Sequence, residues 1–437
     1  MKSFKKIIAC LIIIVALLQP LLVYTQEETA DILKYLDDLD RIVKTAIEKS
    51  GTPGVSIAIV TSDEIQFKSY GYSNKLLINQ VSPKTLFELG SMSKAFTALG
   101  ILYLEQEGKL KLKDNIKDYI PWLILNYSGE YKGQKINGEV PVTIENVLYQ
   151  TTGIPFQTIG YIPEGNSDDI LEKTVRTLIH TELDFYPGTK YSYATINYDI
   201  LGLIIQTVSG QSYESFINEK ILIPLGLNNT YLTRTDAEKT GLFSAGYKTQ
   251  FFNVDAYSAP EYRGNTPAGY VISSANDMAR WMQIQMGLVD VRENYKAIIA
   301  KSHIGNSTVA SSGNAYYAAG WSVHIRGETI GHGGSNPNFS SNLVIDNEKN
   351  IGICVLTNLN SNAAGYITDN FFNLLYNRKI TSYRRDTYQS IDIIFSILCI
   401  GSCVFGIMFF ILLIIAIIET GMKKRSRAVL GVKYVEI

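Results

Sequence analysis

Cysteine is scarce in this chain of 437 residues, with only four. Cys10, Cys399 and Cys403 fall in long apolar stretches near the two ends, which leaves Cys354 for the rest of the chain. A single cysteine cannot form an internal disulfide, so a scaffold held together by disulfides is excluded. The neighbours of Cys354, over residues 351–356, are apolar or glycine, and we interpret Cys354 as a packed strand residue.

Histidine is equally scarce, and an excess of charge of one sign is lacking. The four histidines are His180, His303, His324 and His332. Their spacing matches no zinc-binding pattern, so a metallohydrolase is poorly supported and we expect no metal or other cofactor. The Gly-x-Ser-x-Gly pattern of α/β-hydrolases is also missing from the body of the chain. The formal net charge is −1, so nucleic acid is not an expected partner.

Long apolar runs are confined to the two ends of the chain. Residues 1–6 carry three lysines, and residues 7–18 are uninterrupted apolar sequence. This is the pattern of a secretory signal. We therefore expect residues 1–26 to be a signal peptide or an uncleaved signal anchor, and the domain that follows to be exported.

The second apolar run, Ile393 to Ile418, holds no charged residue and is long enough to cross a bilayer as a helix. Basic residues flank it on both sides, so their distribution does not decide its orientation. The export signal decides the orientation of the span, and it predicts an extracytoplasmic body with residues 419–437 in the cytoplasm. The expected localisation is the cell membrane, with a single carboxy-terminal span at 393–418.

Residues 27–380 form the body, and their apolar spacing predicts strands at both of its ends. The first elements are a helix over Asp31–Lys49, a strand over Gly54–Thr61 and its hairpin partner over Gln66–Tyr72. The last are strands over Ala318–Ile325, Asn342–Ile345 and Ile351–Leu356 and a closing helix over Asn362–Tyr376. This order indicates an α/β (α+β) fold, in which one antiparallel sheet is completed by both chain ends and flanked by helices. A helix-rich lobe is inserted between them.

The segment Phe87–Ala98 (Phe-Glu-Leu-Gly-Ser-Met-Ser-Lys-Ala-Phe-Thr-Ala) is the first candidate for chemistry. Gly90 precedes a helical pattern, so Ser91 is expected at a helix N-terminus, where free N–H groups favour negative charge. Lys94 lies three residues on, on the same face, and a desolvated lysine can activate a serine nucleophile. The spacing alone is weak, because residues 3–6 match it too. A helix cap with a solvated lysine is the alternative.

Two later segments extend the pattern. Tyr186–Tyr198 contains Tyr193-Ala194-Thr195 and leads into an apolar helical run. Ile330–Ser341 (Ile-Gly-His-Gly-Gly-Ser-Asn-Pro-Asn-Phe-Ser-Ser) is rich in glycine. Glycines let the backbone approach a ligand closely, and backbone N–H groups can then point at an oxyanion.

In this order and spacing, the three segments resemble those of serine β-lactamases and penicillin-binding proteins, the class C-like branch in particular. The marks of that family are Ser-x-x-Lys, Tyr-x-Asn and a Lys-Thr-Gly or His-x-Gly strand, and the resemblance covers about residues 30–375. It implies that Ser91 is the nucleophile and that Lys94 and Tyr193 share the transfer of its proton. It also implies an oxyanion hole of the Ser91 and Ser335 backbone N–H groups. The residues that would line the site include His332 and Gly334.

The same segments are similar to those of membrane-anchored prodrug-activating peptidases of the colibactin-maturation and zwittermicin type. Those enzymes remove an N-acyl-D-asparagine cap from a non-ribosomal peptide precursor during export. The residues that would contact the D-asparagine are Glu88, Thr195 and Asn336, and a transporter of the precursor is a possible partner. Thr195 stands where the β-lactamase family has asparagine, and a hydroxyl residue there favours the D-asparagine substrate over ordinary β-lactam or cell-wall substrates. The anchor is a departure from the peptidases, because relatives of this type often carry three carboxy-terminal spans. Gln150 stands where relatives often have histidine.

Other functions remain open on the same fold. They are a D,D-carboxypeptidase, a class C-type β-lactamase or an esterase. An alternative of another class is a membrane sensor that is acylated by cell-wall fragments or β-lactams without turnover. Two of the candidate site residues also have structural interpretations, Glu88 as an acid near a helix start and Asn336 as a turn residue.

Overall fold

The computed structural model describes residues 32–324, 326 and 328–433, so the expected signal at 1–26 lies outside the described residues. The chain divides into two units. One is the body, which runs to Lys248 and again from Ala256 to Arg384. The other joins Thr249–Asp255 to the residues from Arg385 on.

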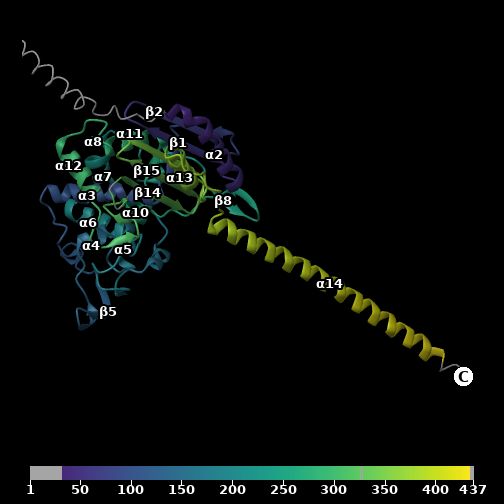
Figure 1. Ribbon diagram of the computed structural model, residues 1–437. Helices are drawn as coiled ribbons and strands as arrows, with labels where there is room; N and C mark the ends of the chain where they lie inside the picture. Colours follow the sequence, from purple (N-terminus) through teal and green to yellow (C-terminus); the bar gives the residue numbers. More distant parts are fainter. Residues whose placement is uncertain (1–31, 325, 327, 434–437) are drawn as a thin grey trace, which may run out of the picture. The chain divides into compact units, whose positions relative to one another are not determined.

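A nine-stranded antiparallel sheet forms the centre of the body (Figure 1). Two of its neighbouring strands come from opposite ends of the body, since Val55 pairs with Thr357 and Val60 with Gly352. This confirms the prediction of an antiparallel sheet completed by both chain ends. The strand order is β11 (Ala310–Ser312), β12 (Ala315–Tyr317), β13 (Ser322–His324), β14 (Thr329–Asn336), β15 (Phe339–Asp346), β16 (Ile351–Thr357), β1 (Gly54–Val60), β2 (Ile65–Asn74) and β3 (Asn79–Gln80).

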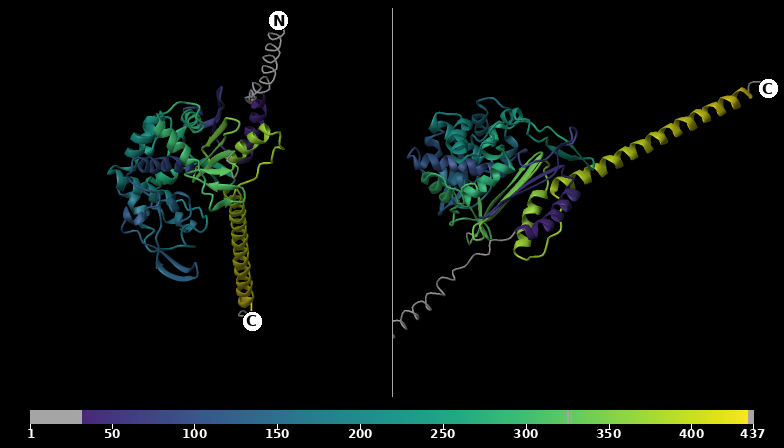
Figure 2. Two further views of the ribbon diagram at one scale, coloured as in Figure 1. Left: turned by 60° about the vertical axis from the view of Figure 1, so that its left-hand side comes forward. Right: turned by 90° about the horizontal axis from the view of Figure 1, so that it is seen from above.

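Helices cover both faces of this sheet (Figure 2). On one face α2 (Leu36–Ser50) and α13 (Ala363–Leu375) pack against alternate residues such as Ile57 and Ile353. On the other face α3 (Lys94–Gln106) and α11 (Ala275–Gln285) pack against the intervening residues of the same strands, such as Cys354. Every residue of β1 and β16 is buried, which explains why both strands are continuous apolar runs in the sequence.

The inserted lobe is helix-rich, as predicted, but it also contains a small sheet that the sequence did not predict. The other helices of this part of the chain are α4 (Ile144–Leu148), α5 (Ile170–Arg176), α6 (Asn197–Ser209), α7 (Tyr213–Ile217), α8 (Ile223–Leu225), α9 (Arg234–Lys239), α10 (Thr266–Gly269) and α12 (Glu293–Ser302). The small sheet consists of β6 (Gln134–Glu139), β5 (Leu125–Tyr131) and β7 (Thr181–Glu182). Its strands carry mostly polar residues and glycine, so they lack the apolar alternation that marks a strand in a sequence.

One prediction near the third motif needs correction. The strand expected over Ala318–Ile325 is wrong in its first half, because the Ala318 N–H donates to the carbonyl of Trp321 across a tight turn. Gly320 has φ 80° in that turn, and β13 begins only at Ser322. The strand β14 was implied by the family resemblance, with its His-x-Gly strand, but not by apolar spacing, since three of its eight residues are glycine and glycine is depleted in strands.

A short strand pair carries the first motif. The strand β4 (Leu86–Glu88) pairs with β10 (Ile272–Ser274), and Glu88 lies opposite Ile272. A 3₁₀ turn over Gly90–Ser93 follows β4 and leads directly into α3. This arrangement holds the residues before Ser91 in a sheet and those after it in a buried helix.

The second unit contains the helix α14 (Thr387–Lys433). Its segment Thr387–Ser426 is long and apolar enough to cross a membrane, judged by length and composition alone. The predicted span at 393–418 lies within this segment. The unit also includes Thr249–Asp255, which contains the turn between β8 (Tyr247–Gln250) and β9 (Asn253–Ala256).

Candidate active site

The turn that carries Ser91 lies directly against the strand β14. Gly90 adopts φ 53°, and a side chain there would collide with the backbone nitrogen of Ser335. Gly334 is restricted in the same way, because a side chain on it would meet the carbonyl oxygen of Leu89 and the hydroxyl of Ser341. The two glycines therefore permit the close approach of the Ser91 turn to the strand that supplies the Ser335 N–H.

The structure brings the three predicted catalytic residues together at one oxygen atom. Lys94 Nζ donates to Ser91 Oγ at 3.1 Å, and the Tyr193 hydroxyl donates to the same Oγ at 2.8 Å. Lys94 also donates to the carbonyl oxygen of Ala268 at 2.6 Å. Ser91 itself remains partly exposed, so its hydroxyl can be reached from outside.

Burial changes the acidity of both partners of Ser91. Lys94 is fully buried, and this burial lowers the pKa of its ammonium to about 7, although the charge of Asp199 acts in the opposite direction. Burial raises the pKa of the Tyr193 phenol above its usual range. Near neutral pH, a large share of Lys94 is therefore an uncharged amine, while Tyr193 keeps its proton.

Gln150 holds the segment that carries Tyr193, a role that the sequence analysis missed. Gln150 is fully buried, with φ 58°, and its side-chain oxygen accepts from the Ala194 N–H at 3.0 Å and from Asn197 Nδ2 at 2.6 Å. Its backbone oxygen accepts from the Ser192 N–H. These bonds fix the chain on both sides of Tyr193.

Replacing Gln150 with alanine should therefore misplace Tyr193. We expect the free energy of unfolding to fall by about 2–4 kcal/mol, because buried groups lose their hydrogen-bond partner. We expect kcat to fall by roughly tenfold to a hundredfold, because a small misplacement of a reacting group is costly. Urea unfolding and steady-state kinetics measure the two effects. The control is Gln285→Ala, since Gln285 is also buried, at 6% exposed, but bonds His303 instead. An equal loss of kcat in both variants would contradict a specific role for Gln150.

His332 lies beside the catalytic residues and is uncharged. Its ring lies 6.2 Å from that of Tyr193, between centroids, and its Nε2 lies 3.3 Å from the Tyr317 hydroxyl. Its Nδ1 lies 2.6 Å from the carbonyl oxygen of Gly333, which makes Nδ1 the protonated nitrogen. Burial and the neighbouring Lys94 lower the pKa of His332 to about 4. His332 therefore lines the site as a neutral group.

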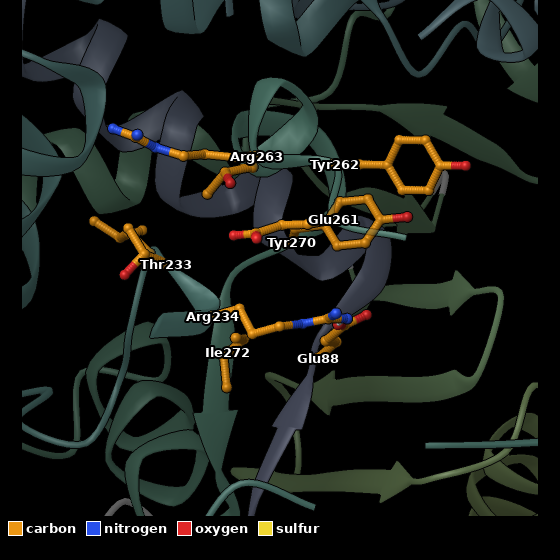
Figure 3. Close-up of a pocket in the computed structure, with 10 residues that line it drawn as sticks. Glu88, Thr233, Arg234, Glu261, Tyr262, Arg263, Tyr270 and Ile272 are labelled. Atoms are coloured by element: carbon orange, nitrogen blue, oxygen red, sulfur yellow. Dashed lines mark hydrogen bonds and ion pairs between the residues drawn. The ribbon is translucent and has the colours of Figure 1, made fainter. Parts of the chain in front are cut away.

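Glu88 is paired on both of its carboxylate oxygens, and Figure 3 shows Arg234 beside its carboxylate. Arg234 Nη2 donates to Oε1 at 3.0 Å, and Asn336 Nδ2 donates to Oε2 at 2.7 Å. Glu88 is only 1% exposed, and burial raises the pKa of its carboxyl while Arg234 acts to lower it. The cavity that Glu88 and Arg234 line has a volume of about 20 Å³, enough for a water-sized group and too small for a substrate side chain. Glu88 thus lies behind Asn336 and orients it.

Asn336 and Thr195, the other two predicted substrate contacts, are both nearly buried. They are 6% and 7% exposed, respectively. Asn336 uses both of its amide N–H groups within the protein, since Nδ2 also donates to the carbonyl oxygen of Gly269 at 2.9 Å. Thr195 follows Tyr193 by two residues on the segment that Gln150 holds. Arg234, which completes this network, has no local motif and lies 146 residues from Glu88 in the sequence.

Among the described residues, no group of three or more His, Cys, Asp or Glu side chains is placed to hold a metal ion. The chemistry that the arrangement can perform comes from the groups around Ser91: a hydroxyl, an amine of lowered pKa and a phenol. Such a set can transfer an acyl group.

Comparisons with known proteins agree with this chemistry. A family model described as Beta-lactamase matches residues 39–378. The protein named Protein flp of Staphylococcus aureus strain N315 is 31% identical over 378 residues, which are 84% of this chain and 73% of that protein. An octameric penicillin-binding protein homologue from Pyrococcus abyssi has a similar structure, with a TM-score of 0.67 and 26% identity over 79% of this chain and 78% of that one. A class C β-lactamase, 22% identical, shares the fold with a TM-score of 0.65 over 79% of this chain and 98% of that one.

Proposed function

Because this chain belongs to the β-lactamase family of serine hydrolases, we propose that it cleaves an amide bond through an acyl-enzyme on Ser91. One observation carries this proposal. Ser91 Oγ lies within hydrogen-bond distance of both Lys94 Nζ and the Tyr193 hydroxyl. A nucleophile with a base on one side and a proton donor on the other is what acyl transfer to serine requires.

In the proposed reaction, Lys94 is the base that activates Ser91. The lysine amine takes the hydroxyl proton as Ser91 Oγ forms a bond to the substrate carbonyl carbon. The negative charge that develops on the carbonyl oxygen is stabilised by the backbone N–H groups of Ser91 and Ser335. The C–N bond breaks, and the leaving amine takes the phenolic proton of Tyr193. Lys94 then passes the proton that it took from Ser91 to the Tyr193 oxygen. Water then attacks the ester, and Ser91 is released with its proton.

The substrate proposed for this site is an N-acyl-D-asparaginyl amide of a peptide precursor. Because both amide N–H groups of Asn336 are donated to protein atoms, its carbonyl oxygen is left to accept a hydrogen bond from substrate. The Thr195 hydroxyl, a hydrogen-bond partner of Tyr193, would turn to donate one to the substrate. A carboxamide side chain has both a donor and an acceptor, so asparagine complements this pair. The D configuration and the N-acyl group rest on the resemblance to prodrug-activating peptidases.

A panel of four substrates tests this proposal. They are an N-acyl-D-asparaginyl amide, its L-isomer, a D-alanyl-D-alanine peptide and a chromogenic cephalosporin. Turnover of the D-asparaginyl compound alone is the expected result. Turnover of the D-alanyl peptide or the cephalosporin instead would favour a D,D-carboxypeptidase or a β-lactamase on the same serine.

The Glu88→Gln variant tests the specificity network separately. Glutamine replaces one acceptor oxygen with an NH₂ group, which opposes either the Arg234 or the Asn336 donor, so Asn336 should lose its orientation. We expect KM for the D-asparaginyl substrate to rise by roughly tenfold to a hundredfold, the cost of an unmatched buried polar group. Hydrolysis of a simple ester should change little.

The matched control is Glu261→Gln, because Glu261 lines the same cavity without contacting Asn336. It should leave KM for both substrates nearly unchanged. If KM rises equally for the ester and the D-asparaginyl amide in Glu88→Gln, Glu88 has no specific role in recognising the asparagine.

For the location, we propose a body outside the cell, tethered by α14. The apolar segment within Thr387–Ser426 supports a span, and the amino-terminal signal pattern at 1–26 supports export. A transporter that delivers the precursor to the outer face would then be a partner. Protease accessibility of the body in intact cells tests this orientation.

A further inference from the structure

Two phenylalanines form the turn between β8 and β9. Phe251 and Phe252 are 60% and 52% exposed. Their φ values are 46° and 67°, in the left-handed region that bulky residues rarely adopt. Two consecutive positive φ values are the geometry of a type I′ turn, which favours Asn-Gly. An exposed apolar pair on a strained turn suggests a partner that buries the two rings.

This turn is bonded to the beginning of the helix α14. The Phe251 N–H donates to one oxygen of the Asp392 carboxylate at 2.8 Å, and the Phe252 N–H donates to the other at 3.0 Å. The turn and the helix belong to the same unit. Asp392 immediately precedes the uncharged run 393–418, and one residue of helix advances only about 1.5 Å. The turn is therefore fixed at the level where the apolar part of the helix begins.

We infer that the Phe251-Phe252 turn inserts into the outer interface of the lipid bilayer beside α14, as a second membrane contact of the protein. The boundary between headgroups and acyl chains is where aromatic side chains are enriched. The two N–H bonds to Asp392 offset part of the cost of bringing a carboxylate close to that boundary. This inference rests on the proposed span and is independent of the proposed substrate.

A second exposed apolar turn adjoins the same strand. Leu76, Leu77 and Ile78 are 83%, 67% and 71% exposed. The preceding Lys75 N–H donates to the hydroxyl of Tyr247, the first residue of β8, at 2.7 Å. The body thus carries exposed apolar side chains of its own close to Tyr247.

Tryptophan quenching in the full-length protein tests this inference. The Phe252→Trp variant is reconstituted in phosphatidylethanolamine–phosphatidylglycerol vesicles whose acyl chains carry bromine near the headgroups. We expect the added emission to fall by more than about half, because interfacial side chains lie roughly 5–10 Å deep, at the level of the bromine. Two of the native tryptophans, Trp281 and Trp321, are buried, and their emission is removed by subtracting the parent spectrum.

The matched control is Phe156→Trp, a phenylalanine of the body that is similarly exposed, at 56%. It should show no quenching beyond that seen in vesicles without bromine. Carbonate extraction of the same vesicles reports the span separately. Protein that resists extraction but shows equal quenching at positions 252 and 156 would overturn the inference while leaving the span in place. Hydrolysis of the D-asparaginyl amide by the same vesicles tests the proposed function. A failure of that function is therefore distinguished from a failure of the membrane contact.

Discussion

Replacing Ser91 with alanine should abolish turnover and leave the fold intact. The substitution removes one oxygen atom, and that atom is the shared partner of Lys94 and Tyr193. Loss of the nucleophile of a serine hydrolase reduces kcat on the order of a million-fold, and we expect at least about 10⁴ here. Hydrolysis of the D-asparaginyl amide measures the effect, and mass spectrometry of the intact protein measures the acyl-enzyme, which should be absent.

The control for this variant is Ser335→Ala. The Ser335 hydroxyl bonds Asn360 at 3.2 Å, while the proposed reaction uses only its backbone N–H, which alanine keeps. Its activity should therefore remain close to that of the parent. Retained hydrolysis by Ser91→Ala would show that Ser91 is not the nucleophile. A parent protein that is acylated on Ser91 but releases no product would instead support the sensor that the sequence left open.

The sequence predicted those parts of the fold whose signals are local. The strands β1 and β16 are buried on both faces and read as unbroken apolar runs, so the sheet completed by both chain ends could be predicted. The proximity of Ser91 and Lys94 follows from helical spacing. The strand β14 could not be found in the same way, because its three glycines, of which Gly334 permits close approach to the Ser91 turn, weaken the strand pattern.

The supporting residues of the site could not be predicted because their partners are distant in the sequence. Arg234 reaches Glu88 across 146 residues, and nothing around Arg234 marks it as part of a site. Gln150 reaches Asn197 across 47 residues. The sequence shows glutamine where relatives often have histidine. It does not show the hydrogen bonds of Gln150, because these depend on a backbone conformation with φ 58°. Short motifs thus identify the reacting groups, and the tertiary structure identifies what positions them.

The buried lysine predicts the second large effect, a rise of kcat/KM with pH through about 7. Burial lowers the pKa of Lys94 to about 7. Below that pH, Lys94 is an ammonium and has no lone pair to accept the Ser91 proton, so activity falls as pH falls. Above it, the amine is free, and Tyr193 still holds its proton because burial raises its pKa. Measuring kcat/KM between pH 5 and 9 with an uncharged substrate gives the midpoint.

Two substitutions separate the base from the charge. Lys94→Met removes the amine at similar length, and we expect a loss of about 10³–10⁴ in kcat/KM together with the loss of the acid limb. Lys94→Arg keeps a cation whose pKa is above about 12, so it cannot accept the proton and should be equally inactive. Activity retained by Lys94→Arg would mean that the positive charge, and not the amine lone pair, is what Ser91 requires.

The midpoint of the pH profile also distinguishes Lys94 from His332 as the base. The pKa of His332 is lowered to about 4, so a base at that position would hold activity down to pH near 4, well below the limb that Lys94 predicts.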